Sequence, residues 1–232
     1  ESGSLARNRP FPTPDQYQSS EVQLALILPR SVFFHFPKTG GYFVREVIRR
    51  SGIPYREDDP TDHSFHNINP AQLKDGVDNA SLKFIFMRHP MEWYASYWNH
   101  RHHVGWEGEL HPGWNAVRIY QARGADTFPE FLEQVLATGT PFISQHQELF
   151  LQMDSIGRLE DLRNELCRIF EAAGEAVDSA LVHGLAAQNV IPYRQSGRIS
   201  LPKALYDRMV ELEGWAFEFF AYPKLSERFE LT

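Results

Sequence analysis

The chain has 232 residues, of which 42% are hydrophobic and 13% aromatic, a composition typical of a globular domain with one sizeable core. The formal net charge of −7 argues against broad electrostatic binding to nucleic acids or other polyanions. The single cysteine, Cys167, excludes an internal disulfide. No apolar run approaches the roughly 20 residues that a membrane-spanning helix needs.

The N-terminal part of the chain predicts an arm followed by a buried strand. Residues 1–30 begin with a polar, Pro- and Ser-rich stretch and are predicted to form an arm or linker, and residues 31–232 a single domain. The apolar run "SVFFHF" (31–36) predicts a strand that is buried on both faces. Gly40 and Gly41 end this strand, and "YFVREVIRRSG" predicts a helix that ends at its own glycine.

The same order of strand, loop and helix recurs about 50 residues later. The segment "LKFIFMR" (82–88) predicts a second buried strand, and "PMEWYASYWNHRHH" the helix that follows it. Between the two units, "HSFHNI" suggests a short strand and "NPAQLKDG" a helix capped by Asn69. Two such units in succession predict an α/β domain with a parallel sheet.

Helices are predicted to dominate the rest of the chain. After a Gly- and Trp-rich loop (104–125), a helix is predicted from Phe128. The segment "LEDLRNELCRIFEAAG" predicts a helix with one apolar stripe. The segment "QNVIPYRQSGRIS" predicts a basic loop, and "PKALYDRMVELEGWAFEFFAY" one continuous closing helix.

The loop "FPKTGG" has the ingredients of an anion-binding site. A helix N-terminus at the end of a parallel strand presents unpaired N–H groups and about half a positive charge. Lys38 adds a full charge and Thr39 a hydroxyl, and the two glycines are expected to let the backbone approach an oxyanion. The nucleoside-triphosphate pattern G-x-x-x-x-G-K-[ST] is absent, and an ordinary turn with an exposed lysine is the alternative.

A second basic group follows the second strand. In "FIFMRHPMEWYAS", Arg88 stands at the end of the strand and Ser96 lies eight residues further on. A guanidinium suits phosphate because its planar fork can donate two parallel hydrogen bonds. A surface arginine in a loose salt bridge is the alternative, but Arg88 with Ser96 predicts a second anion pocket, and two such pockets on neighbouring parallel strands are unlikely to arise by accident.

Together the two motifs resemble those of the sulfotransferase family. "FPKTGG" resembles the 5′-phosphosulfate loop of enzymes that use 3′-phosphoadenosine-5′-phosphosulfate (PAPS), most closely in the carbohydrate-type branch and its bacterial relatives. "RHPMEWYAS" resembles the family's 3′-phosphate motif, while "SIGRLEDLRNELCRIF" and "EFFAYPKL" resemble later, less specific segments. The resemblance implies a three-layer α/β fold, like that of P-loop kinases, in which helices flank a central parallel sheet.

The resemblance also implies roles for matching residues. Lys38 would contact the oxygen that bridges phosphate and sulfate, the loop backbone would hold the 5′-phosphate, and Arg88 with Ser96 would bind the 3′-phosphate. Tyr42 departs from the family's Thr or Ser, and "YRQSGR" stands where cytosolic members have a Gly-rich basic motif. A solvated basic turn is the alternative for that segment. The predicted cofactor-binding residues are Pro37, Lys38, Thr39, Gly40, Gly41, Tyr42, Arg88, Ser96, Tyr193, Arg194, Ser196 and Arg198.

Sulfuryl transfer to a hydroxyl needs a group that takes the proton, and histidine, with a pKa of about 6.5, suits this role. In many family members this histidine lies between the two phosphate motifs, where "TDHSFHNI" supplies two. His66 is predicted as the catalytic base because it lies 22 residues before Arg88, a gap similar to that in relatives. His63 is the second candidate, and a carboxylate base or a helix-capping role for either histidine stays open.

A histidine cluster in "NHRHHVGWEGELH" raises the question of a metal site. A helix would put His100 and His103 on one face and His102 on another, and no carboxylate stands at a characteristic spacing, so no metal site is predicted. We expect the cluster to line or cap an acceptor pocket together with the tryptophans Trp93, Trp98, Trp106 and Trp114.

These features predict a sulfotransferase that moves the sulfuryl group of PAPS to the hydroxyl of a glycan or a small-molecule alcohol, with amines also open. A P-loop-type kinase of small metabolites is one alternative, although no Mg²⁺ carboxylate is evident. A non-catalytic nucleotide-binding module, kept open by Tyr42, is another. No nucleic-acid partner and no metal are expected. A cytoplasmic enzyme of bacterial type is expected, with the lumenal domain of an anchored protein as the alternative, since the chain begins with Glu1.

Overall fold

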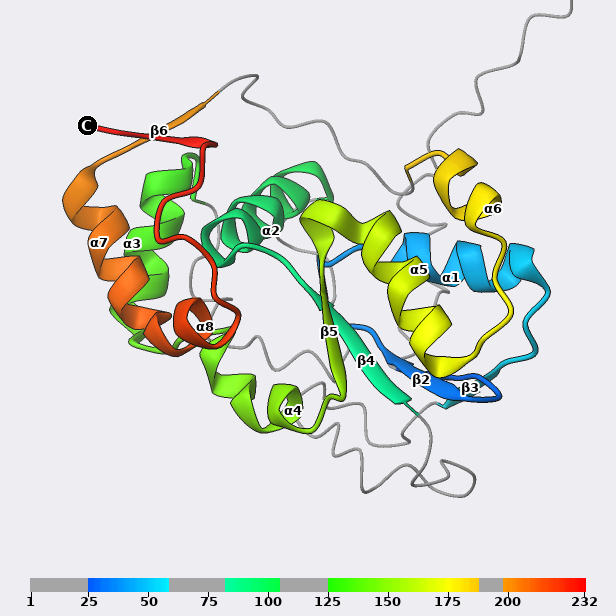
Figure 1. Ribbon diagram of the computed structural model, residues 1–232. Coiled ribbons are helices and arrows are strands. Elements are labelled where there is room, and N and C mark those ends of the chain that lie inside the picture. The colour runs from blue at the N-terminus through cyan, green and yellow to red at the C-terminus, as the bar shows by residue number, and fades with distance from the viewer. Residues whose placement is uncertain (1–24, 59–81, 105–124, 188–197) are drawn as a thin grey trace, which may run out of the picture.

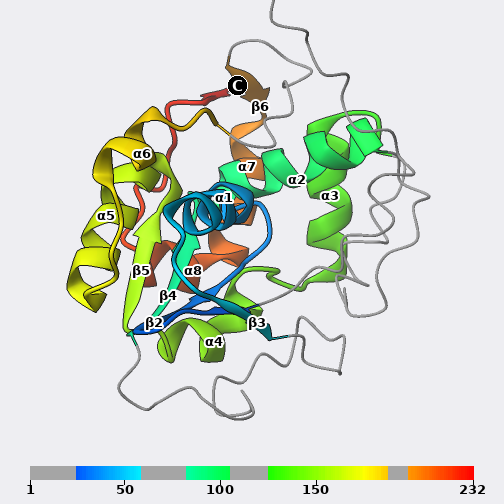
Figure 2. The same ribbon diagram turned by 90° about the vertical axis from the view of Figure 1, so that its right-hand side faces the viewer.

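The computed structural model describes residues 25–58, 82–104, 125–187 and 198–232. Over these residues the chain forms a five-stranded sheet between two layers of helices (Figure 1 and Figure 2). The strands of this sheet are β1 Ala25–Ile27, β2 Ser31–Phe34, β3 Arg56–Asp58, β4 Leu82–Met87 and β5 Ser155–Arg158. A separate parallel pair consists of β6 Ile199–Leu201 and β7 Phe229–Leu231.

The strands lie in the order β3-β1-β2-β4-β5. β2, β4 and β5 run parallel, whereas β1 runs antiparallel to both of its neighbours. The parallel centre agrees with the prediction, and the antiparallel edge was not predicted. β1 falls within residues 1–30, which were predicted as an arm, yet residues 25–28 are buried. The sheet therefore begins ahead of the boundary placed at Ser31.

Helices of very different length surround the sheet. The longer ones are α1 Gly41–Ser51, α2 Pro90–Val104, α3 Phe128–Thr138, α5 Leu162–Ala173 and α7 Lys203–Leu212. The short ones are α4 Gln147–Leu151, α6 Ser179–Gly184 and α8 Gly214–Phe219, with 3₁₀ turns η4 Ser144–His146 and η5 Leu159–Asp161. In the described parts of the chain, no helix is both long and apolar enough to cross a membrane.

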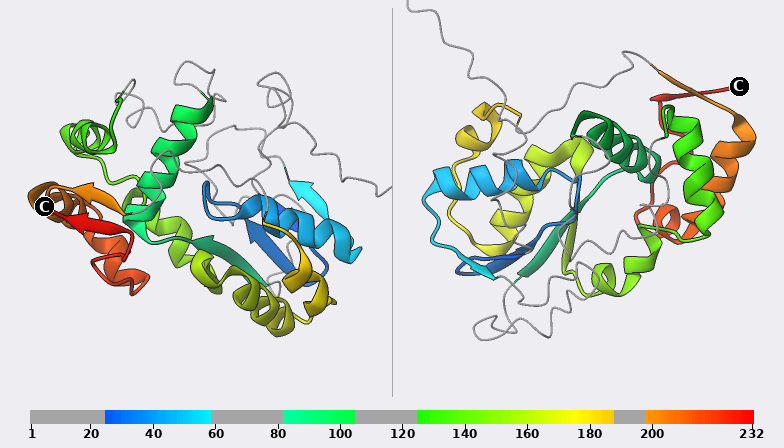
Figure 3. Two further views of the ribbon diagram at one scale, coloured as in Figure 1. Left: turned by 90° about the horizontal axis from the view of Figure 1, so that it is seen from above. Right: turned by 180° about the vertical axis from the view of Figure 1, so that it is seen from behind.

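Alternate residues of the central strands face opposite helix layers. Phe33 of β2 and Phe84 of β4 pack with α1, α5 and α6. Val32 of β2 and Ile85 of β4 pack with α2, α3, α4, α7 and α8 (Figure 1 and Figure 3). Since both faces are buried, these strands have continuous apolar sequences rather than alternating ones. The predicted α/β class, with helices on both faces of the sheet, is confirmed.

The closing helix was predicted as one element and is two. α7 ends at Leu212, and α8 begins at Gly214 after a turn at Glu213, whose φ and ψ are −99° and 22°. The carboxylate of Glu213 is fully buried and accepts hydrogen bonds from side chains and backbone of other elements. The turn places this carboxylate inside the core. The apolar periodicity of the sequence does not reveal this turn, so the segment was predicted as one helix.

Several predicted elements lie outside the described residues. They are the short strand "HSFHNI", the helix capped by Asn69, the Gly- and Trp-rich loop and most of the basic loop before β6.

Candidate functional site

The two sequence motifs meet at one edge of the sheet. β2 ends at Phe34, and the loop of residues 35–40 leads into α1. β4 ends at Met87, and Arg88 leads toward α2. Because β2 and β4 are adjacent and parallel, with Phe34 paired to Ile85, both loops leave the sheet at its C-terminal edge. This is the edge at which open α/β sheets bind ligands.

The loop before α1 has an unusual backbone. Lys38 has a φ of 64° and Gly40 a φ of 86°, both in the left-handed region. That conformation is uncommon for a non-glycine residue, and such outliers concentrate at functional sites. The α1 N-terminus receives no hydrogen bond from a capping side chain. The N-cap residue is Gly40, which has no side-chain oxygen that would compete with a bound anion for the first-turn N–H groups.

Two side chains hold this loop in place. The Thr39 hydroxyl donates a hydrogen bond to the carbonyl of Phe36 at 2.6 Å. The indole Nε1 of Trp93, in α2, donates to the carbonyl of Pro37 at 2.7 Å. Thr39 is thus a buried support of the loop, and α2 fixes the loop from outside.

The two glycines have a packing role that was not predicted. A Cβ atom on Gly41 would lie 2.0 Å from the ring of His35, and one on Gly40 would lie 2.8 Å from Leu159. We expected the missing side chains to leave room for an oxyanion. Side chains of the protein lie where these Cβ atoms would be, and the approach of the loop backbone to an oxyanion stays a prediction.

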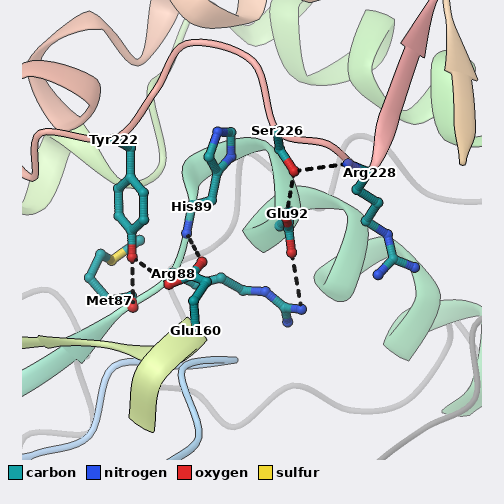
Figure 4. Close-up of polar contacts among 8 residues, drawn as sticks. All are labelled: Met87, Arg88, His89, Glu92, Glu160, Tyr222, Ser226 and Arg228. Carbon is teal, nitrogen blue, oxygen red and sulfur yellow. Dashed lines mark hydrogen bonds and ion pairs between the residues drawn. The ribbon is translucent and has the colours of Figure 1, made fainter. Parts of the chain in front are cut away.

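Arg88 is partly buried and faces a carboxylate. Its guanidinium lies 3.6 Å from Oε2 of Glu92, one helical turn along α2, and 17% of its side chain is exposed. Oε1 of Glu92 accepts a hydrogen bond from the Ser226 hydroxyl at 2.5 Å (Figure 4). Sequence analysis missed Glu92, although its position four residues after Arg88 was a usable signal. This carboxylate orients Arg88 and also weakens the local attraction for an anion.

The turn between β4 and α2 is held by a second carboxylate. Glu160 accepts a hydrogen bond from the backbone N–H of His89 at 2.9 Å and another from the Tyr222 hydroxyl at 2.8 Å (Figure 4). The His89 ring Nε2 donates to the carbonyl of Pro223 at 2.9 Å. Burial and the nearby Glu160 raise the pKa of Tyr222, which therefore stays a neutral donor. Arg88 consequently projects from a rigid backbone.

Lys38 and Arg88 share one electrostatic environment. Burial, together with the positive charges of Arg88 and Arg101, lowers the pKa of Lys38 to about 8. The structure thus brings together the two basic groups that the sequence placed on neighbouring strands, and it adds Arg101. Sequence analysis missed Arg101, because nothing in its spacing separates it from the other basic residues at the end of α2.

One line along α2 is accessible to solvent. Among residues 88–101, Arg88, Glu92, Ser96 and His100 are partly exposed, and the others are buried. Glu92, Ser96 and His100 are spaced by four, so they lie on one face of α2, and Arg88 lies just before the helix, four residues ahead of Glu92. Ser96, predicted to bind a 3′-phosphate with Arg88, therefore lies on the same accessible line as Arg88.

Two tryptophans expected in an acceptor pocket belong to the core. Trp93 is 0% and Trp98 4% exposed. The Nε1 of Trp98 donates to the carbonyl of Ala125 at 3.2 Å. The prediction was wrong for these two because both lie on the buried faces of α2. Trp106 and Trp114 lie outside the described residues.

The other predicted site residues have mixed outcomes. Tyr42 is 47% exposed, and its ring contacts the edge of His35. Arg198 is exposed directly before β6, which lies beside α3 and α7 (Figure 1). Its role in a cofactor site stays a prediction. The residues His63, His66, Tyr193, Arg194 and Ser196 lie outside the described residues.

The histidines of α2 do not form a metal site in the described structure. His102 donates from Nε2 to the carbonyl of Ala125 at 2.7 Å and packs its ring on Trp98. Within the described ranges, no group of three or more His, Cys, Asp or Glu side chains is arranged to hold a metal ion.

Comparison of the chain with models of known protein families finds no match, and searches of the curated proteins and of the solved structures find no significant relative. A helix N-terminus, Lys38 and Arg88 lie at one sheet edge, with Arg101 close to Lys38. This concentration of positive charge, on a chain of net charge −7, suits a small and highly charged anion.

Proposed function

We propose that this protein is a sulfotransferase that moves the sulfuryl group of PAPS to a hydroxyl of a glycan or a small-molecule alcohol. The observation that carries the proposal is that Lys38 and Arg88 follow adjacent parallel strands at one edge of the sheet, and the charge of Arg88 contributes to the lowered pKa of Lys38. A nucleotide with one charged group at its 5′ end and a phosphate at its 3′ position suits two such groups at adjacent strand ends. The parallel order of β2, β4 and β5 supports the sulfotransferase-type fold that the two motifs imply.

The loop before α1 is the proposed site for the 5′-phosphosulfate. Its backbone N–H groups and the α1 N-terminus would hold the 5′-phosphate, and Lys38 would offset the charge that develops on the bridging oxygen as the S–O bond breaks. Thr39 and Trp93 already fix the loop, so little reorganisation is needed when the donor binds. Such preorganisation is the usual source of electrostatic catalysis.

Arg88 and Ser96 are the proposed site for the 3′-phosphate. A phosphate here would compete with Glu92 for the Arg88 guanidinium, across a separation that is already long at 3.6 Å. The Ser226 hydroxyl holds the other oxygen of Glu92, and 17% of the Arg88 side chain is exposed. The sequence-based roles of the basic loop, and of His66 or His63 as proton acceptor, are part of the proposal and concern residues outside the described ranges.

Thermal unfolding with three nucleotides tests this function. We expect 3′,5′-adenosine bisphosphate at 100 times its Kd to raise the Tm by about 5 °C or more, and AMP or ATP–Mg²⁺ to raise it far less. A shift with ATP–Mg²⁺ alone would favour a kinase. Binding of the bisphosphate without transfer from PAPS to any acceptor in a broad panel would favour a non-catalytic binding module.

The affinity for the bisphosphate should fall as the pH rises above about 8. Lys38 has a pKa of about 8 in the free protein, and a bound anion favours its charged form. Above that pH, Lys38 must take up a proton when the ligand binds, so the affinity falls by up to about tenfold per pH unit. Isothermal titration calorimetry from pH 7 to 9.5 measures this, because the charge of the ligand's phosphates, whose second pKa is about 6, changes little over that range.

A Lys38→Arg variant is the matched control for this pH dependence. Arginine keeps its charge over the whole range, so its affinity should be independent of pH. A wild-type affinity that stays constant between pH 7 and 9.5 would show that Lys38 does not contact the ligand.

A further inference from the structure

The C-terminal segment contributes a buried hydroxyl next to the proposed 3′-phosphate site. Ser226, which is 7% exposed, donates a hydrogen bond of 2.5 Å to Oε1 of Glu92, a residue 134 positions earlier in the chain (Figure 4). The other carboxylate oxygen, Oε2, lies 3.6 Å from the guanidinium of Arg88. One carboxylate therefore links Ser226 to the arginine that is assigned to the 3′-phosphate.

The position of the Ser226 hydroxyl is fixed by the turn that leads into β7. Its Oγ accepts a hydrogen bond from the N–H of Arg228 at 3.2 Å, and its carbonyl accepts one from the N–H of Phe229 at 3.1 Å. Phe229 is buried and begins β7, which pairs with β6. Because the Oγ accepts a hydrogen bond from the backbone and donates one to Glu92, the hydroxyl proton points at the carboxylate.

A freed Glu92 would compete with a ligand for Arg88. It stands in the first turn of α2, four residues after Arg88, a spacing at which opposite charges pair. A charge-assisted hydrogen bond between nitrogen and oxygen is about 2.7–2.9 Å long, so the pair is only loosely formed at the observed 3.6 Å. The two side chains are 17% and 20% exposed, so salt would screen a closer pair only weakly. The group that holds the carboxylate back therefore decides how much of the arginine's charge is left for a phosphate.

We propose that Ser226 is a positioning residue of the 3′-phosphate site, which restrains Glu92 and so leaves the Arg88 guanidinium for a phosphate. The inference rests on the proposed function. Ser226 acts through Glu92, without contacting the nucleotide. When the 3′-phosphate binds, it replaces the carboxylate as the partner of Arg88, while the carboxylate keeps its hydrogen bond to Ser226. The C-terminal segment thus sets the selectivity of a site whose charged groups lie at the start of α2.

Replacing Ser226 with alanine should weaken the binding of 3′,5′-adenosine bisphosphate at least about threefold and leave the affinity for AMP unchanged. Without the hydroxyl, Glu92 turns toward Arg88 and competes with the 3′-phosphate. Ser226→Thr keeps the hydroxyl and should bind the bisphosphate within about twofold of wild type. Ser200→Ala, at an exposed position of β6, is the matched control and should bind both ligands like wild type. Isothermal titration calorimetry measures these affinities.

A double variant distinguishes positioning from a general effect on the fold. In Glu92→Gln, the side chain has no charge with which to compete for Arg88. Adding Ser226→Ala to this variant should therefore change the affinity for the bisphosphate by less than about twofold. A merely structural role would weaken binding equally with and without Glu92→Gln, and would weaken AMP binding as well. Such an equal loss, or an unchanged bisphosphate affinity in Ser226→Ala alone, would overturn the proposal.

An NMR measurement without ligand separates this inference from the proposed function. In protein labelled with ¹⁵N-arginine, the signal that is lost in Arg88→Ala identifies the Nε–Hε group of Arg88. Ser226→Ala should shift this signal and slow its exchange with water at least about twofold, because Glu92 then holds the guanidinium more closely. Adding Glu92→Gln should remove both changes. An Arg88 signal that Ser226→Ala leaves unchanged would overturn the positioning role, whereas a wild-type protein that binds no bisphosphate would refute the proposed function.

Discussion

Replacing Arg88 with alanine should remove the preference for 3′,5′-adenosine bisphosphate over AMP. The two ligands differ by the 3′-phosphate alone. Arg88 is the residue that we propose binds this phosphate. A charge-assisted hydrogen bond contributes about 1.5 to 3 kcal/mol, so the bisphosphate should bind roughly 10- to 100-fold more weakly. The affinity for AMP should change little. Isothermal titration calorimetry with both ligands measures the two affinities.

Two further variants sharpen this experiment. Arg168→Ala removes an arginine that pairs with Glu165 on the exposed side of α5, and it should not change either affinity. Glu92→Gln removes the carboxylate that faces Arg88, and it should strengthen bisphosphate binding severalfold because the repulsion is lost. If Arg88→Ala still discriminates between the ligands, the 3′-phosphate site lies elsewhere.

Replacing Glu213 with alanine should lower the free energy of unfolding by about 3 to 5 kcal/mol. The fully buried carboxylate accepts hydrogen bonds from the Tyr94 hydroxyl, the Ile143 N–H, and the N–H and hydroxyl of Ser144. These donors come from α2 and from the segment around η4, so Glu213 joins three parts of the larger helix layer. Alanine would leave all the donors buried without an acceptor. Urea unfolding monitored by tryptophan fluorescence measures the change.

Two control variants test whether the loss of stability comes from the buried carboxylate of Glu213. Glu213→Gln keeps the size and one acceptor oxygen, so its loss should be smaller than that of Glu213→Ala. Glu218→Ala, at an exposed position of α8, should stay within about 0.5 kcal/mol of wild type. A loss below about 1 kcal/mol in Glu213→Ala would mean that water or a rearranged side chain satisfies the donors.

The layered core follows directly from the apolar patterns. The runs at 31–36 and 82–88 are hydrophobic at successive positions, and in the structure β2 and β4 are buried on both faces. β1 escaped prediction because it lies in a run of only five apolar residues (24–28) after a long polar stretch, which resembles any short apolar segment. Its place became definite only through hydrogen bonds to β2 and β3.

The sequence by itself determined that a lysine and an arginine follow two strands long enough and apolar enough to be neighbours in a parallel sheet. The tertiary structure decided what those groups meet: Glu92 faces Arg88, Trp93 holds the lysine loop, and burial with the charges of Arg88 and Arg101 lowers the pKa of Lys38. Spacing along one chain specifies which residues share a strand end or a helix face. It does not specify the distance between side chains on different elements, and electrostatic interaction depends on that distance.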